Sequence, residues 1–98
     1  MTYKVVLKIE ADEELSKLSK REQLLVFKQL KKISNSPQLG QLLGNKNGFD
    51  LSGCRKMYAD KKKIRIVYSI FKDEILVEVI AIGKRDELEV YKNASKRL

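Results

Sequence analysis

The second half of the chain contains three runs rich in β-branched and aromatic residues, with short polar segments between them. The runs cover residues 55–59, 64–71 and 75–82, and the turn candidates between them are 60–63 and 72–74. Turns this short join strands that run in opposite directions. The pattern therefore predicts an antiparallel meander of three strands, which constrains how the rest of the chain can pack.

The first half of the chain predicts a strand followed by two helices. Residues 3–9 (YKVVLKI) are typical of a strand, and the acidic residues within 10–14 suit the start of a helix. Ser19 and Glu22 have the spacing of a capping box, which predicts the start of a second helix. Two antiparallel helices are therefore expected after the first strand.

The second helix carries an apolar repeat and a set of lysines. Its apolar side chains recur at helical spacing and are expected to face the core, namely Leu24, Phe27, Leu30 and Ile33. Three lysines lie away from this repeat and are expected to form a solvated face, namely Lys28, Lys31 and Lys32. Residues 35–37 (NSP) end the helix, and a long irregular connection then runs to Gly53.

These elements predict one domain over residues 1–98, of the α+β class. A small antiparallel sheet, formed by the N-terminal strand and the C-terminal meander, packs on the two N-terminal helices. A short helix from about Asp86 to Arg97 follows the sheet. The last two runs of the meander are apolar on both alternating faces, as expected of central strands. Because the two helices can cover one face, a functional site is expected on the other.

The absence of histidine restricts the chemistry. The chain has 98 residues, no histidine and a single cysteine, Cys54. This composition excludes histidine-based nucleases and the usual Cys/His zinc sites, so a general acid or base must come from Lys, Tyr, Asp, Glu or Cys. Glycine-rich phosphate-binding signatures are also missing, and we expect no metal and no cofactor. Cys54 is expected to be a small buried apolar residue.

The charge of the chain favours a polyanionic partner. Lys and Arg number 21 against 13 Asp and Glu, which gives a net charge of +8. Clustered cations of this kind bind nucleic acid or an acidic protein. No apolar stretch approaches the roughly 18 residues of a membrane span, and no signal-peptide core is present. We therefore expect a cytoplasmic protein without membrane contact.

The predicted meander brings three polar side chains to one face. If residues 60–63 form a four-residue turn, Tyr58 lies opposite Arg65, and strand alternation adds Lys56 to the same face. An arginine on an otherwise apolar central strand is costly unless it reaches a rim, a groove or an anionic partner. Arg65 is therefore the leading site candidate. The alternative is that it pairs with a carboxylate such as Glu78 at the rim of the sheet.

The order and spacing of four segments resemble those of the RelE family of toxins. The segments are LSGCRK at 51–56, KIRIVY at 63–68, VIAIGKR at 79–85 and EVY at 89–91, followed by Ala94 and Arg97. The resemblance extends over nearly the whole chain. It implies a small antiparallel sheet packed against two helices.

The resemblance also implies a function and partners. RelE-type members are toxins of type II toxin–antitoxin systems, and they enter the ribosomal A site and cleave messenger RNA there. A cognate antitoxin wraps the toxin and silences it. This chain is therefore expected to be a messenger RNA endoribonuclease whose partners are messenger RNA, the ribosome and an antitoxin.

Individual residues follow from the same resemblance. Arg65 matches the family's phosphate-contacting arginine, and Arg85 matches its second catalytic arginine. Tyr91 matches the family's tyrosine, and Lys56 the first of its two functional lysines. Tyr58 stands where the family has the second lysine. Other cations are expected to bind RNA, namely Arg55, Lys61, Lys62, Lys63 and Lys84.

The family's reaction is attack of a ribose 2′-hydroxyl on the adjacent phosphate. Arg65 and Arg85 suit the stabilisation of negative charge on the phosphorane. The base remains open between Lys56, Tyr58 and Tyr91, because neighbouring cations can lower the pKa of an ammonium or of a phenol, normally about 10.

Two other functions fit the same fold. A ParE-like poison of DNA gyrase needs no RNA-cleaving residues, and the presence of Arg65, Arg85 and Tyr91 argues against it. A catalytically weak relic that only binds an antitoxin is favoured by Tyr58, which replaces a family lysine.

Overall fold

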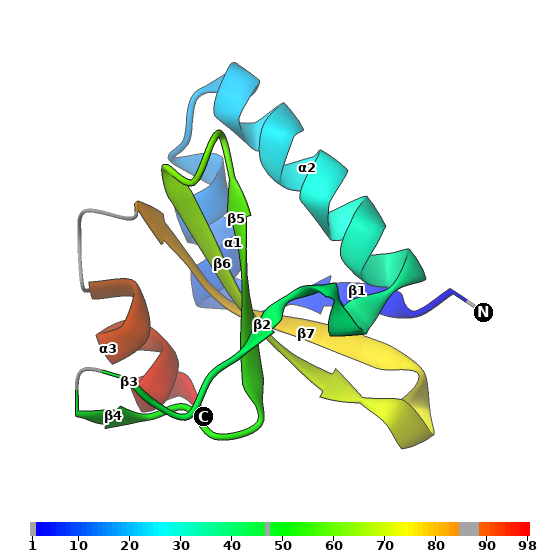
Figure 1. Cartoon of the computed structure of the whole chain (residues 1–98). Coiled ribbons are helices and arrows are strands. Elements are labelled where there is room, and N and C mark those ends of the chain that lie inside the picture. The colour runs from blue at the N-terminus through cyan, green and yellow to red at the C-terminus, as the bar shows by residue number, and fades with distance from the viewer. Residues whose placement is uncertain (1, 47, 85–88) are drawn as a thin grey trace.

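The computed structural model describes residues 2–46, 48–84 and 89–98 (Figure 1). Over these residues the chain forms β1 (Lys4–Leu7), α1 (Ile9–Ser16), α2 (Lys20–Asn35), the 3-10 turn η1 (Pro37–Leu39), β2 (Gln41–Leu42), β3 (Asn45–Lys46), β4 (Phe49–Asp50), β5 (Cys54–Ala59), β6 (Ile64–Phe71), the 3-10 turn η2 (Lys72–Glu74), β7 (Leu76–Lys84) and α3 (Glu89–Arg97). Among the described residues, no helix has the length and apolar character needed to cross a lipid bilayer.

The larger sheet is built around the predicted meander. β5, β6 and β7 pair antiparallel, and Tyr58 lies opposite Arg65 as predicted. In the described part of the chain the strand order is β1-β7-β6-β5-β2. β1 pairs with β7 in parallel, so the sheet is mixed and not wholly antiparallel as predicted. Because helices and other strands separate β1 from β7 in sequence, no tight turn forces opposite directions. The predicted α+β class is confirmed.

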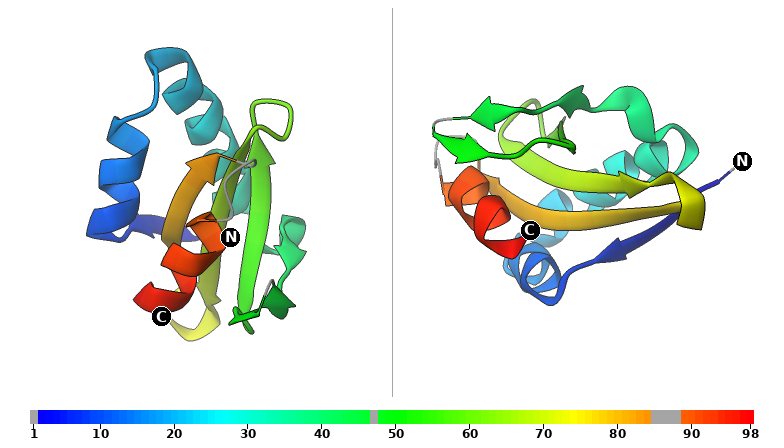
Figure 2. Two further views of the ribbon diagram at one scale, coloured as in Figure 1. Left: turned by 90° about the vertical axis from the view of Figure 1, so that its left-hand side faces the viewer. Right: turned by 90° about the horizontal axis from the view of Figure 1, so that it is seen from below.

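Each face of the sheet packs against a different set of elements. Helices α1 and α2 lie along one face, and α3 lies on the other near the β3–β4 hairpin (Figure 2). Ile64, Ile66 and Tyr68 of β6 pack into the core on the α1/α2 face. Val67 packs on the opposite face with Val90, Tyr91 and Ala94 of α3. Each buried side chain of this size contributes about 1.5–3 kcal/mol, so β6 stabilises both layers.

The buried face of α2 differs from the prediction. Val26, Leu30 and Ile33 are buried, whereas Leu24 is 64% exposed and Phe27 is 50% exposed. Repeated steps of three residues each fall about 60° short of a full helical turn. Three such steps carry Leu24 to the side of the helix opposite Ile33. Steps of four and then three residues keep Val26, Leu30 and Ile33 on one side.

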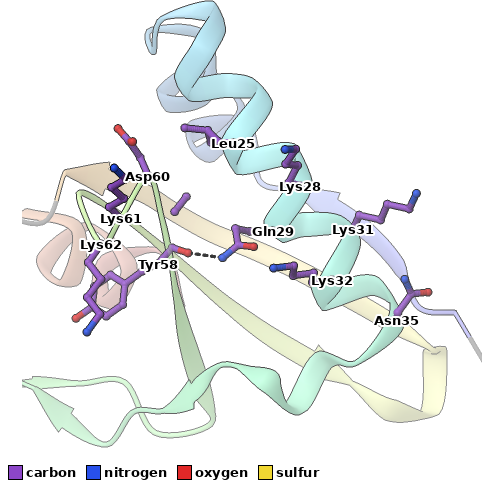
Figure 3. A pocket seen from close by; sticks show the side chains of 11 residues that line it. Leu25, Lys28, Gln29, Lys31, Lys32, Asn35, Tyr58, Asp60, Lys61 and Lys62 are labelled. Carbon is purple, nitrogen blue, oxygen red and sulfur yellow. Dashed lines mark hydrogen bonds between the residues drawn. The ribbon is translucent and has the colours of Figure 1, made fainter.

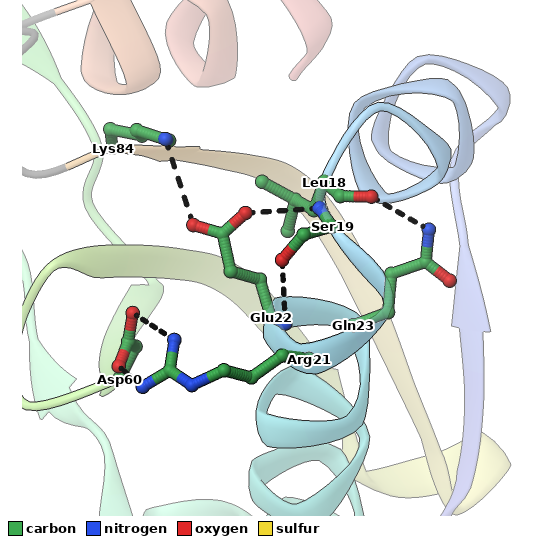
Figure 4. A network of polar contacts seen from close by, with 7 residues as sticks. All are labelled: Leu18, Ser19, Arg21, Glu22, Gln23, Asp60 and Lys84. Atoms are coloured by element: carbon green, nitrogen blue, oxygen red, sulfur yellow. Dashed lines mark hydrogen bonds and ion pairs between the residues drawn. The ribbon is translucent and has the colours of Figure 1, made fainter.

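The start of α2 is as predicted. The Glu22 backbone N–H donates to the Ser19 hydroxyl at 3.1 Å, and the Ser19 N–H donates to the Glu22 carboxylate at 3.0 Å (Figure 4). This backbone hydrogen bond from Ser19 lowers the pKa of Glu22 below its usual range. Lys84 at the end of β7 pairs with the same carboxylate at 3.6 Å, so the capping box also connects α2 to the sheet.

The long connection is fastened to the sheet by Tyr68. The buried Tyr68 hydroxyl donates to the Pro37 carbonyl at 2.6 Å and accepts from the Gly40 N–H at 2.9 Å. A Cβ atom at Gly40 would collide with this hydroxyl, which explains the glycine. Arg55 donates to the carbonyls of Gly40 at 2.8 Å and Gln38 at 3.3 Å. The connection therefore adds the edge strand β2, which the sequence did not predict.

Replacing Tyr68 with Phe should lower the free energy of unfolding by about 1–3 kcal/mol, because two buried backbone groups lose their partner. Urea denaturation followed by circular dichroism measures this change. Tyr3→Phe is the control, since the Tyr3 hydroxyl makes no hydrogen bond to a described residue. Equal stabilities of the two variants would show that this hydroxyl does not hold the connection.

Candidate active site

Three predicted site residues lie on the face of the sheet that α3 packs against. Lys56 and Tyr58 alternate along β5, and Tyr58 pairs with Arg65 of β6. Met57 and Ile66, which lie between them along the strands, pack into the core on the α1/α2 face. Because successive strand side chains point to opposite faces, Lys56, Tyr58 and Arg65 share the α3 face.

Helix α3 adds Tyr91 to this cluster. The helix spans Glu89–Arg97, and its predicted start at Asp86 lies outside the described residues. Tyr91 is fully buried, and the guanidinium carbon of Arg65 lies 4.7 Å from the centre of its ring. A cation–π contact of this kind contributes about 0.5–2 kcal/mol. It holds the Arg65 side chain in place over the helix.

Several buried donors of this cluster have no hydrogen-bond partner among the described residues. Arg65 Nε, Arg65 Nη1 and the Tyr91 hydroxyl are buried and make no hydrogen bond to any residue in the described ranges. Such unsatisfied groups each cost about 1–3 kcal/mol. A guanidinium and a phenol that share one place suit an anion with several oxygens, such as a phosphate.

The alternative pairing of Arg65 with Glu78 is wrong. Glu78 lies opposite Ser69 in the β6–β7 register, and its carboxylate pairs with Lys8 at 3.8 Å. Strand alternation in the sequence could not exclude this pair. The β6–β7 register contains a shift between Val67 and Tyr68, which alternation alone does not predict.

Lys56 and Tyr58 form a close pair. Lys56 is only 7% exposed, and its ammonium donates to the Tyr58 hydroxyl at 2.7 Å. The hydrogen bond from Lys56 lowers the pKa of Tyr58, and the charge of Arg65 adds to this effect. A phenolate is stabilised by neighbouring cations. Tyr58 therefore loses its proton, and becomes a phenolate that can act as a base, at a lower pH than an ordinary tyrosine does.

Arg85, another predicted catalytic residue, is outside the described residues. The predicted RNA-binding residues lie apart from the cluster. Lys61, Lys62 and Lys63 are exposed at the tip of the β5–β6 hairpin. Arg55 is directed to carbonyls of the long connection, and Lys84 to the α2 capping box. Their RNA-binding roles stay predictions, while Lys56, Tyr58, Arg65 and Tyr91 come together.

A salt bridge that the sequence did not predict fastens α3 to the rest of the fold. Arg97 donates to the Glu14 carboxylate at 2.8 Å and to the Ile80 carbonyl at 2.9 Å. Glu14 also accepts from the Ile82 N–H at 3.1 Å. β1 ends opposite Val79, so among the described residues no strand pairs with this part of β7 on that side. The two charged side chains complete its backbone hydrogen bonds and hold the helix that carries the cluster's tyrosine.

Cys54 is buried, as predicted. Burial raises the pKa of its thiol, and the Cys54 sulfur lies 3.4 Å from the Ser69 hydroxyl oxygen. A thiol with a raised pKa is a weak nucleophile. Cys54 is therefore a packing residue.

Sequence comparisons place the chain beside known toxins. No protein-family model matches it. A protein of Escherichia coli named as a RelE-like toxin is 32% identical over 100 residues, covering 100% of this chain and 99% of that protein. The mRNA interferase toxin RelE of Escherichia coli strain K12 is 34% identical over 80 residues, covering 80% of this chain and 76% of that protein.

Solved structures agree with the sequence comparisons. The Escherichia coli toxin RelE, as a variant with two arginine-to-alanine substitutions in the free state, matches with a TM-score of 0.82 and 28% identity, covering 100% of this chain and 99% of that chain. The same variant in complex with an antitoxin RelBc peptide matches with a TM-score of 0.73 and 28% identity over the same shares.

The ionisation of Tyr58 should depend on Lys56. Replacing Lys56 with Met should raise the pKa of Tyr58 toward the ordinary value of about 10, because the ammonium that favours the phenolate is lost. NMR titration of ¹³C-labelled tyrosine rings measures this pKa. Lys63→Met removes a charge from the exposed hairpin tip and serves as the control. A pKa of Tyr58 unmoved by Lys56→Met would contradict the assigned pair.

Removal of the Arg97 side chain should loosen α3. Arg97→Leu leaves the Glu14 carboxylate and the Ile80 carbonyl without this donor and should lower the free energy of unfolding by about 1–3 kcal/mol. Hydrogen exchange should increase in α3 before it increases in β6. Lys96→Leu, on the same helix and exposed, is the matched control. Equal exchange in α3 for both variants would argue against the salt bridge as its fastening.

Proposed function

Because this chain belongs to the family of RelE-type toxins, we propose that it is the toxin of a type II toxin–antitoxin pair and an endoribonuclease that cuts messenger RNA. A relative with 34% identity is named an mRNA interferase, which supports the reaction. The proposed site is the cluster formed by Lys56, Tyr58, Arg65 and Tyr91.

The combination of cations and phenols in one buried cluster carries this proposal. Arg65 stacks on Tyr91, and Lys56 donates to Tyr58. Within the described residues, neither Lys56 nor Arg65 forms an ion pair with a carboxylate. Cations kept at low exposure without a carboxylate partner favour an external anion. A phosphate of RNA is an anion of suitable geometry for a guanidinium.

The chemistry follows from the cluster's protonation. The 2′-oxygen of a ribose attacks the adjacent phosphorus, and the bond to the next 5′-oxygen breaks. The departing 5′-oxygen takes a proton from solvent, and a 2′,3′-cyclic phosphate and a 5′-hydroxyl result. Tyr58 takes the proton of the 2′-hydroxyl, since Lys56 and Arg65 lower its pKa. Arg65 donates to the phosphate oxygens as negative charge develops on them. Arg85 is assigned the same task from the family resemblance.

RNA entry requires a local movement. Tyr91 of α3 and two nitrogens of Arg65 are buried, whereas Tyr58 is half-buried. RNA therefore meets Tyr58 first and reaches the Tyr91 hydroxyl after α3 or the Arg65 side chain shifts. The Glu14–Arg97 salt bridge resists movement of α3.

The proposed partners follow from the family. A structure of a RelE variant in complex with an antitoxin peptide supports an antitoxin as the partner that silences this toxin. The ribosomal A site is the proposed place of cleavage, with messenger RNA as the substrate. For such a substrate we propose the cytoplasm as the location of the activity.

A second candidate function is an antitoxin-binding protein that no longer cuts RNA. Tyr58 favours it, because this tyrosine stands where the family has a lysine. One substitution, Tyr58→Lys, distinguishes the two functions experimentally. If the natural chain makes no cuts and Tyr58→Lys does, the chain is such a relic.

The cluster should be required for cleavage. In a bacterium induced to express the chain, growth should stop and new messenger RNA ends should map to A-site codons. Arg65→Ala and Tyr91→Phe should abolish the cuts, and Tyr58→Phe should slow cleavage by about 10²- to 10⁴-fold, as expected for loss of a general base. Mapping of RNA ends on translating ribosomes measures all three.

Lys72→Ala, an exposed position on η2, is the control and should cut as the natural chain does. Growth arrest without new RNA ends would point to DNA gyrase as the target. Cleavage retained in folded Arg65→Ala, Tyr91→Phe and Tyr58→Phe proteins would remove the cluster from the mechanism.

A further inference from the structure

A second basic feature lies between α2 and the tip of the β5–β6 hairpin. This lysine groove has a volume of about 590 Å³ and is lined by Leu25, Lys28, Gln29, Lys31, Lys32, Asn35, Tyr58, Ala59, Asp60, Lys61 and Lys62 (Figure 3). Lys32 extends from α2 toward Gln29 and the strand, and Lys61 and Lys62 extend from the hairpin tip (Figure 3). The lysines that the sequence analysis assigned to a solvated face therefore border a concave surface.

The five lysines of the groove have no ion-pair partner among the described residues. The one acidic residue in its lining, Asp60, is bound by both terminal nitrogens of Arg21, at 2.9 and 3.3 Å (Figure 4). Lys28 and Lys32 are four residues apart on α2, a spacing at which like charges destabilise a helix. The arrangement favours an anionic ligand.

The geometry of the groove is held by specific contacts. Gln29 of α2 donates to the Tyr58 carbonyl at 2.6 Å across its floor. At the hairpin tip, Asp60, Lys61 and Lys62 have φ angles of 51°, 53° and 71°. Three consecutive non-glycine residues in the left-handed region are strained, and such strain occurs where surrounding structure holds a functional segment. The Arg21–Asp60 ion pair fastens this tip to α2.

Tyr58 connects the groove to the cluster. Its main chain forms part of the groove, while its side chain lies beside Lys56. The groove and the cluster therefore adjoin at Tyr58. We propose that the lysine groove binds the phosphate backbone of an RNA segment outside the scissile phosphate, an inference that rests on the proposed endoribonuclease function.

The composition of the groove favours RNA over an acidic protein. Five of its eleven lining residues are lysines, contributed by α2 and by the hairpin tip. Phosphates at every nucleotide can meet lysines from two elements in succession. The RNA is either the continuation of the substrate strand or an exposed strand of ribosomal RNA, since both present the same phosphates.

Neutralising the lysines of α2 tests this proposal. The groove variant is Lys28→Gln/Lys31→Gln/Lys32→Gln, and the matched control is Lys4→Gln/Lys17→Gln/Lys72→Gln, at exposed positions elsewhere. Both lower the net charge of +8 by three units. A third variant, Lys28→Arg/Lys31→Arg/Lys32→Arg, keeps the charge. All are made in the full chain and first compared by circular dichroism.

Binding is measured with a 2′-O-methyl RNA oligonucleotide of 20 nucleotides and with purified ribosomes that carry no messenger RNA. The groove variant should bind at least one of these about tenfold more weakly, and its log–log salt slope should fall by about 2, since each single-strand phosphate contact contributes about 0.7. The control and the arginine variant should keep the slope of the natural chain. Loss with the oligonucleotide identifies the substrate strand, and loss with ribosomes alone identifies ribosomal RNA.

An unchanged slope of the groove variant with both probes would overturn the proposal. So would a loss confined to a polyglutamate peptide, which would point to an acidic protein partner. The oligonucleotide lacks the 2′-hydroxyl needed for cleavage, so binding is measured independently of catalysis. Absence of messenger RNA cleavage by the natural chain would reject the endoribonuclease function and leave the binding result standing.

Discussion

Strand β6 is hydrogen-bonded to β5 on one side and to β7 on the other, and both of its faces are covered. Ile66 packs toward α1 and α2, while Val67 packs toward α3. A slip of one residue in this pairing would exchange the two faces and carry Arg65 into the apolar core. The position of the cationic cluster therefore depends on the register between β5 and β6, and α3 then covers it.

The cluster lowers the stability of the fold. Lys56 and parts of Arg65 are removed from water without a carboxylate partner in the described residues. Phenol contacts from Tyr58 and Tyr91 reduce this cost, but they do not supply a negative charge at neutral pH unless a phenol ionises. A fold that keeps cations at the site without a carboxylate partner in the described residues, and that lines a second groove with lysines, is adapted to a polyanion more than to its own stability.

Local signals in the sequence predicted much of the fold. The capping box of Ser19 and Glu22, the meander and the pairing of Tyr58 with Arg65 each depend on residues close in sequence. The errors concern distant partners. The direction of β1 is decided beside β7, and the edge strand β2 depends on the buried Tyr68 hydroxyl. The wrong prediction of the buried face of α2 has a local cause. Helical geometry alone places Leu24 on the side of the helix opposite Ile33, so Leu24 could have been excluded from the predicted apolar face.

For the site, the sequence by itself determined which chemical groups are available and which neighbours share a strand face. It supplied no histidine, a basic surplus and the alternation that joins Lys56, Tyr58 and Arg65. Only the tertiary structure decided that Tyr91 lies on Arg65, that Glu14 fastens α3 through Arg97, and that lysines of α2 meet the hairpin tip. The physical reason is that backbone periodicity places side chains within one element, whereas contacts between elements depend on how their buried surfaces pack.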